Sequence, residues 1–360
     1  MQELASGYGR AHISGELLSV VRDADQAKSY NGVGGVSYVT GYEGNKQHLM
    51  LEGGWEDQFI LPGGVTATPY LGARLDASRY DGTSPPPTDA NLLSLTPIAA
   101  MDFRWPLVAH NGFDTHLLEP IAQLVYRGSS TTAVGITNDD AQSFVFDTSN
   151  LFSYNKFSGI DRQDTGLRAN IGGHYLGNFA DGSWLDLIAG ESFHLAGTNA
   201  LGIADAAQVG TSTGLGSAAS YIVASAQAGL PDGISGGAKL QVDPKGFKVT
   251  RAGLGVNYAP GNGWSAGADY IYIAPQPALG TKLPQHELAG RVGVPVYDYW
   301  TLSAGLTYNL DKMTWIKANT GLVYDDTYLK FGINAYVSNP GDPGFGLVFN
   351  LNGPDGKAAF

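Results

Sequence analysis

Apolar and polar residues alternate along the C-terminal part of the chain. From residue 300 to residue 310 every second residue is apolar or aromatic, and the residues between them are small or polar. Successive side chains of a β-strand point to opposite faces, so a period of two indicates a strand with one apolar face. Short turns at Asp311 and Lys312 and at Asp325 and Asp326 precede two further strands of this kind. The pattern predicts a meander of about ten-residue strands, the length of a tilted transmembrane strand.

The same period recurs over most of the remaining chain. It is clearest at residues 71–77, 167–175, 185–195, 222–230, 252–258 and 264–272. Weaker versions occur at residues 33–42, with 48–55 as the expected partner strand, and at 97–107, 115–127 and 288–296. Pro295 should weaken the last of these locally, because proline cannot donate to the ladder. Roughly sixteen to eighteen strands predict one all-β domain over residues 1–360, a transmembrane antiparallel β-barrel with up-and-down meander topology.

Composition supports a membrane barrel over a soluble or helical protein. Only 15% of the 360 residues are charged and 50 are glycine, whereas a soluble domain carries about a quarter charged residues. No run approaches the roughly 18 apolar residues of a transmembrane helix. A net charge of −12 argues against nucleic acid as a partner. The absence of cysteine excludes disulfides and thiolate metal sites.

Aromatic residues at the predicted strand ends fit the girdles where a barrel meets lipid headgroups. They include Trp264, Tyr299, Trp300, Tyr308, Trp315 and Tyr324. The alternative is cross-strand packing in a soluble β-sandwich or β-solenoid. The barrel is favoured, because a soluble single sheet would have nothing against which to bury so many apolar rows.

The first ten residues contain no charged segment followed by an apolar one, so no secretory signal peptide is recognisable. An outer-membrane protein must be exported. We therefore expect the natural start to lie upstream and this chain to be an N-terminally truncated part of a larger barrel.

Alternation stops between residues 128 and 165. A connection of this length is usually functional or disordered, because about 4 to 6 residues is typical. The segment keeps too many large apolar residues for disorder. We predict an ordered loop, extracellular or folded into the lumen, in which Asp161, Arg162 and Arg168 form an ion-pair cluster; the alternative is that these charges are solvated and unrelated.

Candidate catalytic and metal-binding residues give weak signals. His174 and His194 lie on predicted polar faces, and Ser192 is two residues from His194, but no G-x-S-x-G motif is present. Histidines on a lumen wall need no catalytic explanation. Asp139, Asp140 and Asp147 lack the spacing of a dedicated calcium loop, which favours a solvated acidic loop. We predict no enzymatic activity, no cofactor and no metal site.

Residues 138–168 carry a more specific pattern, NDDAQSFVFDTSNLFSYNKFSGIDRQDTGLR. It resembles the C-terminal barrel domain of the lipopolysaccharide-assembly family LptD, also called OstA or Imp, particularly its alphaproteobacterial members. Residues 118–123 and 59–76 fit the same family. The residues that carry the resemblance are Asp140, Phe144, Phe146, Asp147, Asn150, Leu151, Phe152, Asn155, Phe157, Ser158, Gly159, Asp161, Arg162 and Arg168.

The resemblance implies a translocon in the outer membrane of a Gram-negative bacterium. Such a protein receives lipopolysaccharide through an N-terminal jellyroll domain from a periplasmic LptA-type bridge and inserts it into the outer leaflet. An LptE-type lipoprotein plugs the lumen, and the substrate leaves between the first and last strands. Departures from the family are the missing jellyroll, fewer strands, the missing cysteines and a tail at residues 352–360.

The resemblance also implies a lateral gate at the last strand, expected at residues 344–351. Gly346, Phe349 and Leu351 loosely match the C-terminal signal read by the barrel-assembly machinery. Pro340 and Pro343 precede this strand and shorten its pairing, although an ordinary turn would explain them equally well.

Two other functions stay open. A general diffusion porin, or another passive outer-membrane channel, shares the barrel and would show opposed basic and acidic rows at a constriction. The low content of lysine and arginine argues mildly against it. A barrel enzyme acting on lipids would require a reactive serine.

Overall fold

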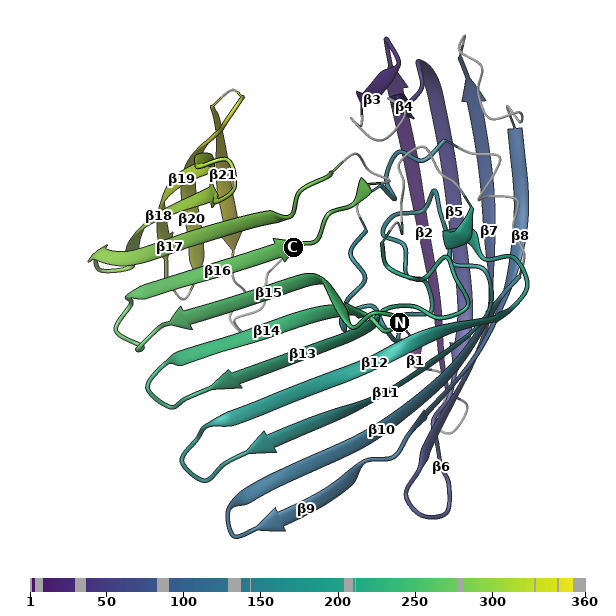
Figure 1. The fold of residues 1–360 in the computed structure, drawn as a ribbon, viewed down its shortest axis with the longest axis horizontal. Helices are drawn as coiled ribbons and strands as arrows, with labels where there is room; N and C mark the ends of the chain where they lie inside the picture. The colour runs from purple at the N-terminus through teal and green to yellow at the C-terminus, as the bar shows by residue number, and fades with distance from the viewer. Residues whose placement is uncertain are drawn as a thin grey trace.

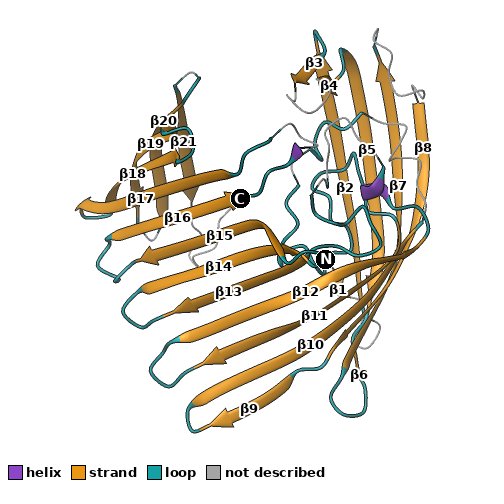
Figure 2. Ribbon diagram, viewed as in Figure 1, coloured by secondary structure: helices purple, strands orange, loops and turns teal. Residues whose placement is uncertain are grey.

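The structure is a computed structural model, and it describes residues 2–3, 9–29, 37–82, 91–128, 137–142, 144–203, 210, 212–277, 281–326, 328–341 and 343–351. Nearly all regular structure in these residues is strand (Figure 2). One 19-stranded sheet curves around a single interior, and β3 and β4 form a separate two-stranded sheet (Figure 1).

The strands alternate with turns throughout the described chain. Their bounds are β1 (Gln2–Glu3), β2 (Arg10–Arg22), β3 (Gln26–Ser29), β4 (Ser37–Gly41), β5 (Gly44–Glu56), β6 (Phe59–Ile60), β7 (Thr66–Asp81), β8 (Asn91–Arg104), β9 (Leu107–Asn111), β10 (Asp114–Arg127), β11 (Gly166–Asn178), β12 (Trp184–Ala196), β13 (Ile222–Gly229), β14 (Ile234–Asp243), β15 (Lys248–Tyr258), β16 (Ser265–Ile273), β17 (Gln285–Tyr297), β18 (Trp300–Asn309), β19 (Thr314–Asp325), β20 (Leu329–Ser338) and β21 (Gly344–Leu351).

The sheet is an antiparallel meander. Sixteen of these strands have eight residues or more, and each pairs with the next long strand along the chain, from β2 and β5 to β20 and β21. The short strands β6 and β9 continue the pairing of β5 and β8 after a break. The prediction of an all-β, up-and-down barrel is confirmed, but the sheet is not closed, because no pairing among the described residues joins β21 to β2.

The two faces of the sheet differ as a membrane barrel requires. On β7, Leu71 is 57% exposed on the outside, whereas Arg74 and Asp76 are 2% and 0% exposed on the inside. Similar exposed apolar residues follow the outer face from Ile13 on β2 to Phe345 on β21. Lipid takes the place of a packed partner on this outer face.

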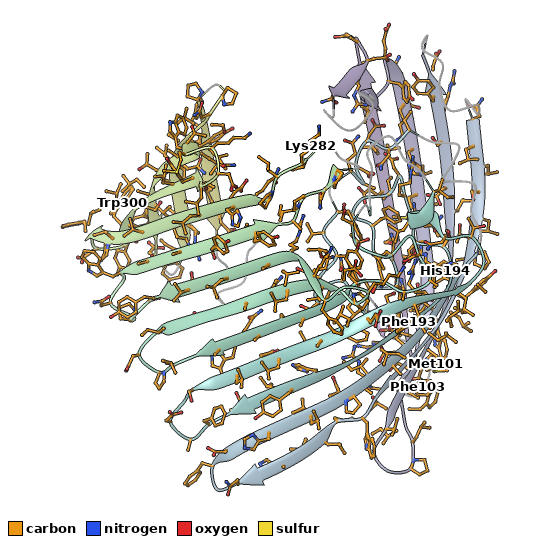
Figure 3. The ribbon with its side chains drawn as sticks, viewed as in Figure 1. Met101, Phe103, Phe193, His194, Lys282 and Trp300 are labelled. Atoms are coloured by element: carbon orange, nitrogen blue, oxygen red, sulfur yellow. The ribbon has the colours of Figure 1, made fainter. Side chains whose placement is uncertain are left out.

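Aromatic residues mark both rims. Trp300 and Tyr324 are register partners at the rim of short turns, and their rings lie 5.3 Å apart. Tyr308 and Trp315 pair at the opposite rim, where the long connections lie. Figure 3 shows Trp300 at the outer end of β18, beside the short turns. The described residues contain no helix long and apolar enough to cross a membrane.

Two parts of the strand prediction are wrong, and the expected effect of Pro295 is confirmed. Strands β2 and β14 were missed, because glycine and charged residues interrupt their alternation. The partners of β5 are β2 and β7, while β4 pairs with β3. Pro295 does disturb its ladder, since the register of β17 on β18 shifts between Pro295 and Tyr297. The proline-rich residues 84–89 and the tail at 352–360 lie outside the described residues.

The two faces of β15 predict opposite tolerance to charge. Leu254 is exposed on the outer face, whereas no atom lies within 4 Å of a Cβ placed at its neighbour Gly253. We expect Leu254→Arg to lower the free energy of unfolding from lipid vesicles by about 2–4 kcal/mol, as arginine does in hydrocarbon. Gly253→Arg points into the lumen and should cost less than about 1 kcal/mol. Equal losses in denaturant titrations would contradict the assignment of faces.

Candidate functional site

Residues 137–142 and 144–165, which we call the inner loop, lie against the inside of the sheet. The inner loop contains no strand, yet it contacts β5, β7, β10, β13 and β14. Figure 1 shows the connections beyond β10 running within the curve of the sheet. The motif residues therefore lie between the inner loop and the wall.

A buried ion-pair cluster attaches the inner loop to β5 and β7. Asp161 lies 2.6 Å from Lys46 Nζ and 2.8 Å from His48 Nδ1. Lys46 also reaches Asp139, at 2.8 Å, and His48 Nε2 reaches Asp76, at 2.9 Å. Burial of so many charges is tolerable only because each faces an opposite one.

His48 joins the wall to the loop. Both of its ring nitrogens face carboxylate oxygens, one from Asp76 on β7 and one from Asp161 on the inner loop. Only the imidazolium has two N–H donors for this arrangement. Arg74 Nη2 donates one hydrogen bond to Asp76 Oδ1, at 2.6 Å, and another to the carbonyl oxygen of Ile160. Wall and loop thus share one network of hydrogen bonds.

Asp140 and Gly159 shape the turn that presents Asp161. The Asp140 carboxylate accepts hydrogen bonds from the backbone N–H groups of Ile160 (2.7 Å) and Asp161 (3.0 Å). Gly159 has φ +71°, and a Cβ there would lie 2.5 Å from the Asp140 carboxyl carbon. Glycine is needed both for the left-handed backbone and for the close approach.

The two loop carboxylates have opposite pKa shifts. Burial disfavours the charge of Asp161, but the bonds from His48 and Lys46 outweigh it and hold the pKa of Asp161 well below its usual range. Burial and the neighbouring charge of Asp161 raise the pKa of Asp140, against the two backbone donors. Asp161 is therefore the fixed negative charge of the cluster.

The apolar motif residues form a small core of their own. Phe146, Leu151 and Phe157 are buried together with Leu201, Leu215 and Val223, and Phe144 and Phe152 pack against them. Val223 belongs to β13, and the other partners come from the connection before it. The hydrophobic effect thus holds the inner loop to the neighbouring connection and to the wall.

Polar contacts tie the loop to the wall beyond this core. Gln241 on β14 donates to the Phe146 carbonyl oxygen (3.0 Å), and Asp147 pairs with Lys239 (2.8 Å). Burial and the Lys239 and Ser149 hydrogen bonds oppose each other at Asp147, and the net effect lowers its pKa. Asn150 closes the local turn by accepting from the Asp147 backbone N–H (3.1 Å).

A pair of glycines creates room for the loop on the wall. Gly172 and Gly190 are register partners on β11 and β12. A Cβ at Gly172 would lie 3.1 Å from Phe152, and one at Gly190 would lie 2.6 Å from Leu151. Side chains at these positions would also meet backbone oxygens. The wall is therefore flat where the inner loop packs.

The three residues of the predicted ion-pair cluster have contacts with different partners. Asp161 pairs with Lys46 on the wall, and Arg168 pairs instead with Asp164, at 3.0 Å. Arg162 donates to the carbonyl oxygen of Asp161, at 2.9 Å. The alternation of β7 already placed Arg74 and Asp76 inside, but only the path of the loop shows which inward residues meet it.

Among the described residues, the calcium-binding and Ser–His arrangements considered from the sequence are not assembled. Asp139 is paired with Lys46, Asp140 caps a turn and Asp147 pairs with Lys239, so the acidic residues are bound within the protein rather than solvated. Among the described residues no group of three or more His, Asp or Glu could hold a metal ion. Ser192 Oγ and His194 Nε2 have no hydrogen-bond partner, so they form no Ser–His couple. Figure 3 labels His194 on β12.

The expected gate residues lie on or beside the last strand. Gly346, Phe349 and Leu351 belong to β21, which pairs with β20 over its whole length. Phe349 is exposed on the outer face. Pro340 follows β20 and Pro343 precedes β21. In the described part of the chain β21 has no partner on its other edge.

Comparison with known proteins identifies a relative at the level of a family. A profile described as LptD, LPS transport system D, matches residues 8–300. Similar solved structures include two mutants of the porin of Rhodopseudomonas blastica, with 14% and 15% identity and TM-scores of 0.38 and 0.39. Each alignment covers 94% of this chain and 98% of the porin. No curated protein matches the chain.

Asp161→Asn should release the inner loop. The change leaves Lys46 with Asp139 and His48 with Asp76 as their remaining counter-charges, but it removes the charge by which the loop residue Asp161 is paired with the wall, and breaking a buried pair costs about 3–5 kcal/mol. We expect trypsin to cleave within residues 144–165 of the purified variant at least about tenfold faster, since a tenfold change needs only about 1.4 kcal/mol. Asp181→Asn, in an exposed turn, is the control. Unchanged cleavage in Asp161→Asn would mean that the cluster does not hold the loop.

Lys156 should make the loop's stability depend on pH. It donates to the Leu151 carbonyl oxygen (2.8 Å), and burial lowers its pKa to about 8. The unfolded lysine keeps its proton up to about pH 10.4, so the folded loop gains stability as pH rises from about 8 to 10.

Hydrogen exchange, corrected for the intrinsic pH dependence of amide exchange, measures this gain. Protection of residues 151–160 should rise roughly tenfold between pH 7.5 and 9.5, following the linkage relation for one lysine. The trend should vanish in Lys156→Met. A rise of equal size in that variant would assign it to another group.

Proposed function

The chain belongs to the LptD family, and from this premise we propose that it is an outer-membrane translocon component that inserts lipopolysaccharide into the outer leaflet. The family description is a lipopolysaccharide transport system. The proposal requires no enzymatic step and no cofactor. The observation that carries it is the inner loop, in which the family motif joins the wall through buried charges.

The inner loop leaves the two halves of the barrel with different inner surfaces. Charged residues of β2 to β12 face the loop and are paired with it or with one another. From β17 to β21 one inward register row contains only small or neutral polar residues: Gly293, Ser303, Gly321, Asn334 and Gly346. Such a row suits contact with a large hydroxyl-rich glycan, because it offers hydrogen bonds without charge. The inward charges of Arg291 and Asp269 beside the row are paired with each other.

The open edge of β21 supports a lateral route. Unpaired strand backbone is unfavourable in hydrocarbon, so this edge requires a partner strand that can separate from it. The row of small residues leads to β21. We infer that the glycan follows the neutral wall to this seam while the acyl chains enter the membrane beside Phe349.

The partners follow from the same proposal. Lipopolysaccharide is the cargo, an LptA-type bridge supplies it and an LptE-type lipoprotein shares the lumen. The barrel-assembly machinery would insert the chain. A porin function is less well supported, because the inner loop is fixed across the wall by two separate sets of contacts, at β5 and β7 and at β13 and β14.

Photocrosslinking in membranes of the source cell tests the route. A photoreactive phenylalanine analogue replaces Phe349, the inward Asn334 or, as a control, the outward Leu187 on β12. We expect lipopolysaccharide adducts at Phe349 and Asn334 that fall at least about fivefold when lipopolysaccharide supply is stopped. Adducts at Leu187 report bulk membrane and should not change.

Photoreactive probes at Phe152 and Phe157 in the inner loop should give no lipid adduct. Any crosslink that they form should be to a small lipoprotein. The translocon proposal fails if Asn334 and Phe349 give no supply-dependent adduct while the purified protein conducts ions steadily across a bilayer. The proposed function would then be that of a passive channel.

A further inference from the structure

The unpartnered buried polar atoms of the described residues gather in one place. Arg127 Nε, Arg168 Nη1, Asn170 Oδ1, Ser192 Oγ and His194 Nε2 have no hydrogen-bond partner. They lie on three adjacent strands, β10, β11 and β12, where Arg168 is opposite His194 and Asn170 is opposite Ser192. Buried polar groups are nearly always satisfied in native proteins, so a cluster of exceptions indicates a bound partner.

A small cavity lies between these strands and the inner loop. Its lining includes Arg127, Arg168 and Asn170 from the wall and Lys156 and Asp164 from the loop. The three wall side chains are 2%, 3% and 0% exposed. The cavity has a volume of about 10 Å³, which is room for about one water-sized particle. Only a single atom, a small ion or a water molecule can occupy it.

The orientation of Asn170 is determined by its neighbours. Gln123 donates its amide N–H groups to Asp102 (3.0 Å) and to the Phe152 carbonyl oxygen (2.8 Å). Its oxygen therefore accepts from Asn170 Nδ2, at 2.7 Å. The arginine donors are fixed in the same way, because Arg127 pairs with Glu52 (2.9 Å) and Arg168 with Asp164 (3.0 Å). Arg127 Nη2 also donates to Gln163 and Arg168 Nη2 to Asn199. Arg127 Nε and Arg168 Nη1 are left for another acceptor.

The charges around the cavity favour a negative ion. Arg127, Lys156 and Arg168 line it, while Asp164 is the one carboxylate among the lining residues. Lys156 donates to carbonyl oxygens of Asn150, Leu151 and Ser153, so its charge has no carboxylate partner in these bonds. Burial and the charge of Arg168 lower the pKa of Lys156, and together they outweigh the opposing effect of the Asp164 carboxylate.

We propose that this cavity is a site for one small monovalent anion of the halide class, bound by Arg127 Nε and Arg168 Nη1 beneath the inner loop. A water molecule could accept the same hydrogen bonds and donate one to Asn170 Oδ1. It would, however, leave the charge of Lys156 without a counter-ion, because Glu52 and Asp164 already pair with the two arginines. The anion would stabilise the packing of residues 153–165 on β10 and β11. The site does not depend on the transport function, since its residues belong to the loop and wall alone.

Crystallography of the full-length protein in bromide tests the site without mutation. Anomalous scattering should locate one bromide between the two arginines. At constant ionic strength, chloride should also raise the melting temperature above that in gluconate, which is too large to enter, by about 3 °C at a chloride concentration far above Kd.

A carboxylate placed in the cavity should replace the anion. In Asn170→Asp the difference between chloride and gluconate should fall below about 1 °C. Asn319→Asp makes the same change on the inward face of β19, away from the cavity, and should keep the chloride effect. Density for a water molecule only, or an equal melting temperature in both salts for the unmodified protein, would overturn the proposal.

Discussion

A charge removed from water must face an opposite charge, and this constraint determines how the inner loop lies in the barrel. Asp161 is fully buried, and its carboxylate has a place only between Lys46 and His48. His48 in turn needs Asp76 on the next strand. The loop cannot shift along the wall without leaving several charges unpaired, so its position is specific even though it contains no strand.

The motif residues make this contact possible in different ways. Asp140 and Gly159 act on the backbone, since one caps the turn and the other permits its conformation. The aromatic residues supply a core that the thin barrel wall cannot provide, because each strand of the wall has one face toward lipid. Gly172 and Gly190 on the wall remove side chains where that core lies. Loop and wall are therefore complementary in charge and in shape.

This attachment concentrates buried charge on one part of the wall. The strands that hold the loop carry the buried acidic and basic pairs, whereas one inward row that ends at Gly346 is small and neutral. The more exposed inward pair of Arg291 and Asp269 lies beside that row. The same half of the sheet contains the edge strand β21, so the neutral surface and the open edge adjoin.

The sequence by itself determined the class of fold, the faces of most strands and the importance of residues 138–168, because alternation and the motif are local properties. It did not reveal β2 and β14, where glycine and charged residues break the alternation. It also did not identify Lys46 and His48 as partners of Asp161. Lys46 and His48 lie more than a hundred residues from Asp161, and only the tertiary path of the loop brings them together. Ion pairs of this kind depend on which inward side chains the loop crosses, and period-two patterning contains no information about that path.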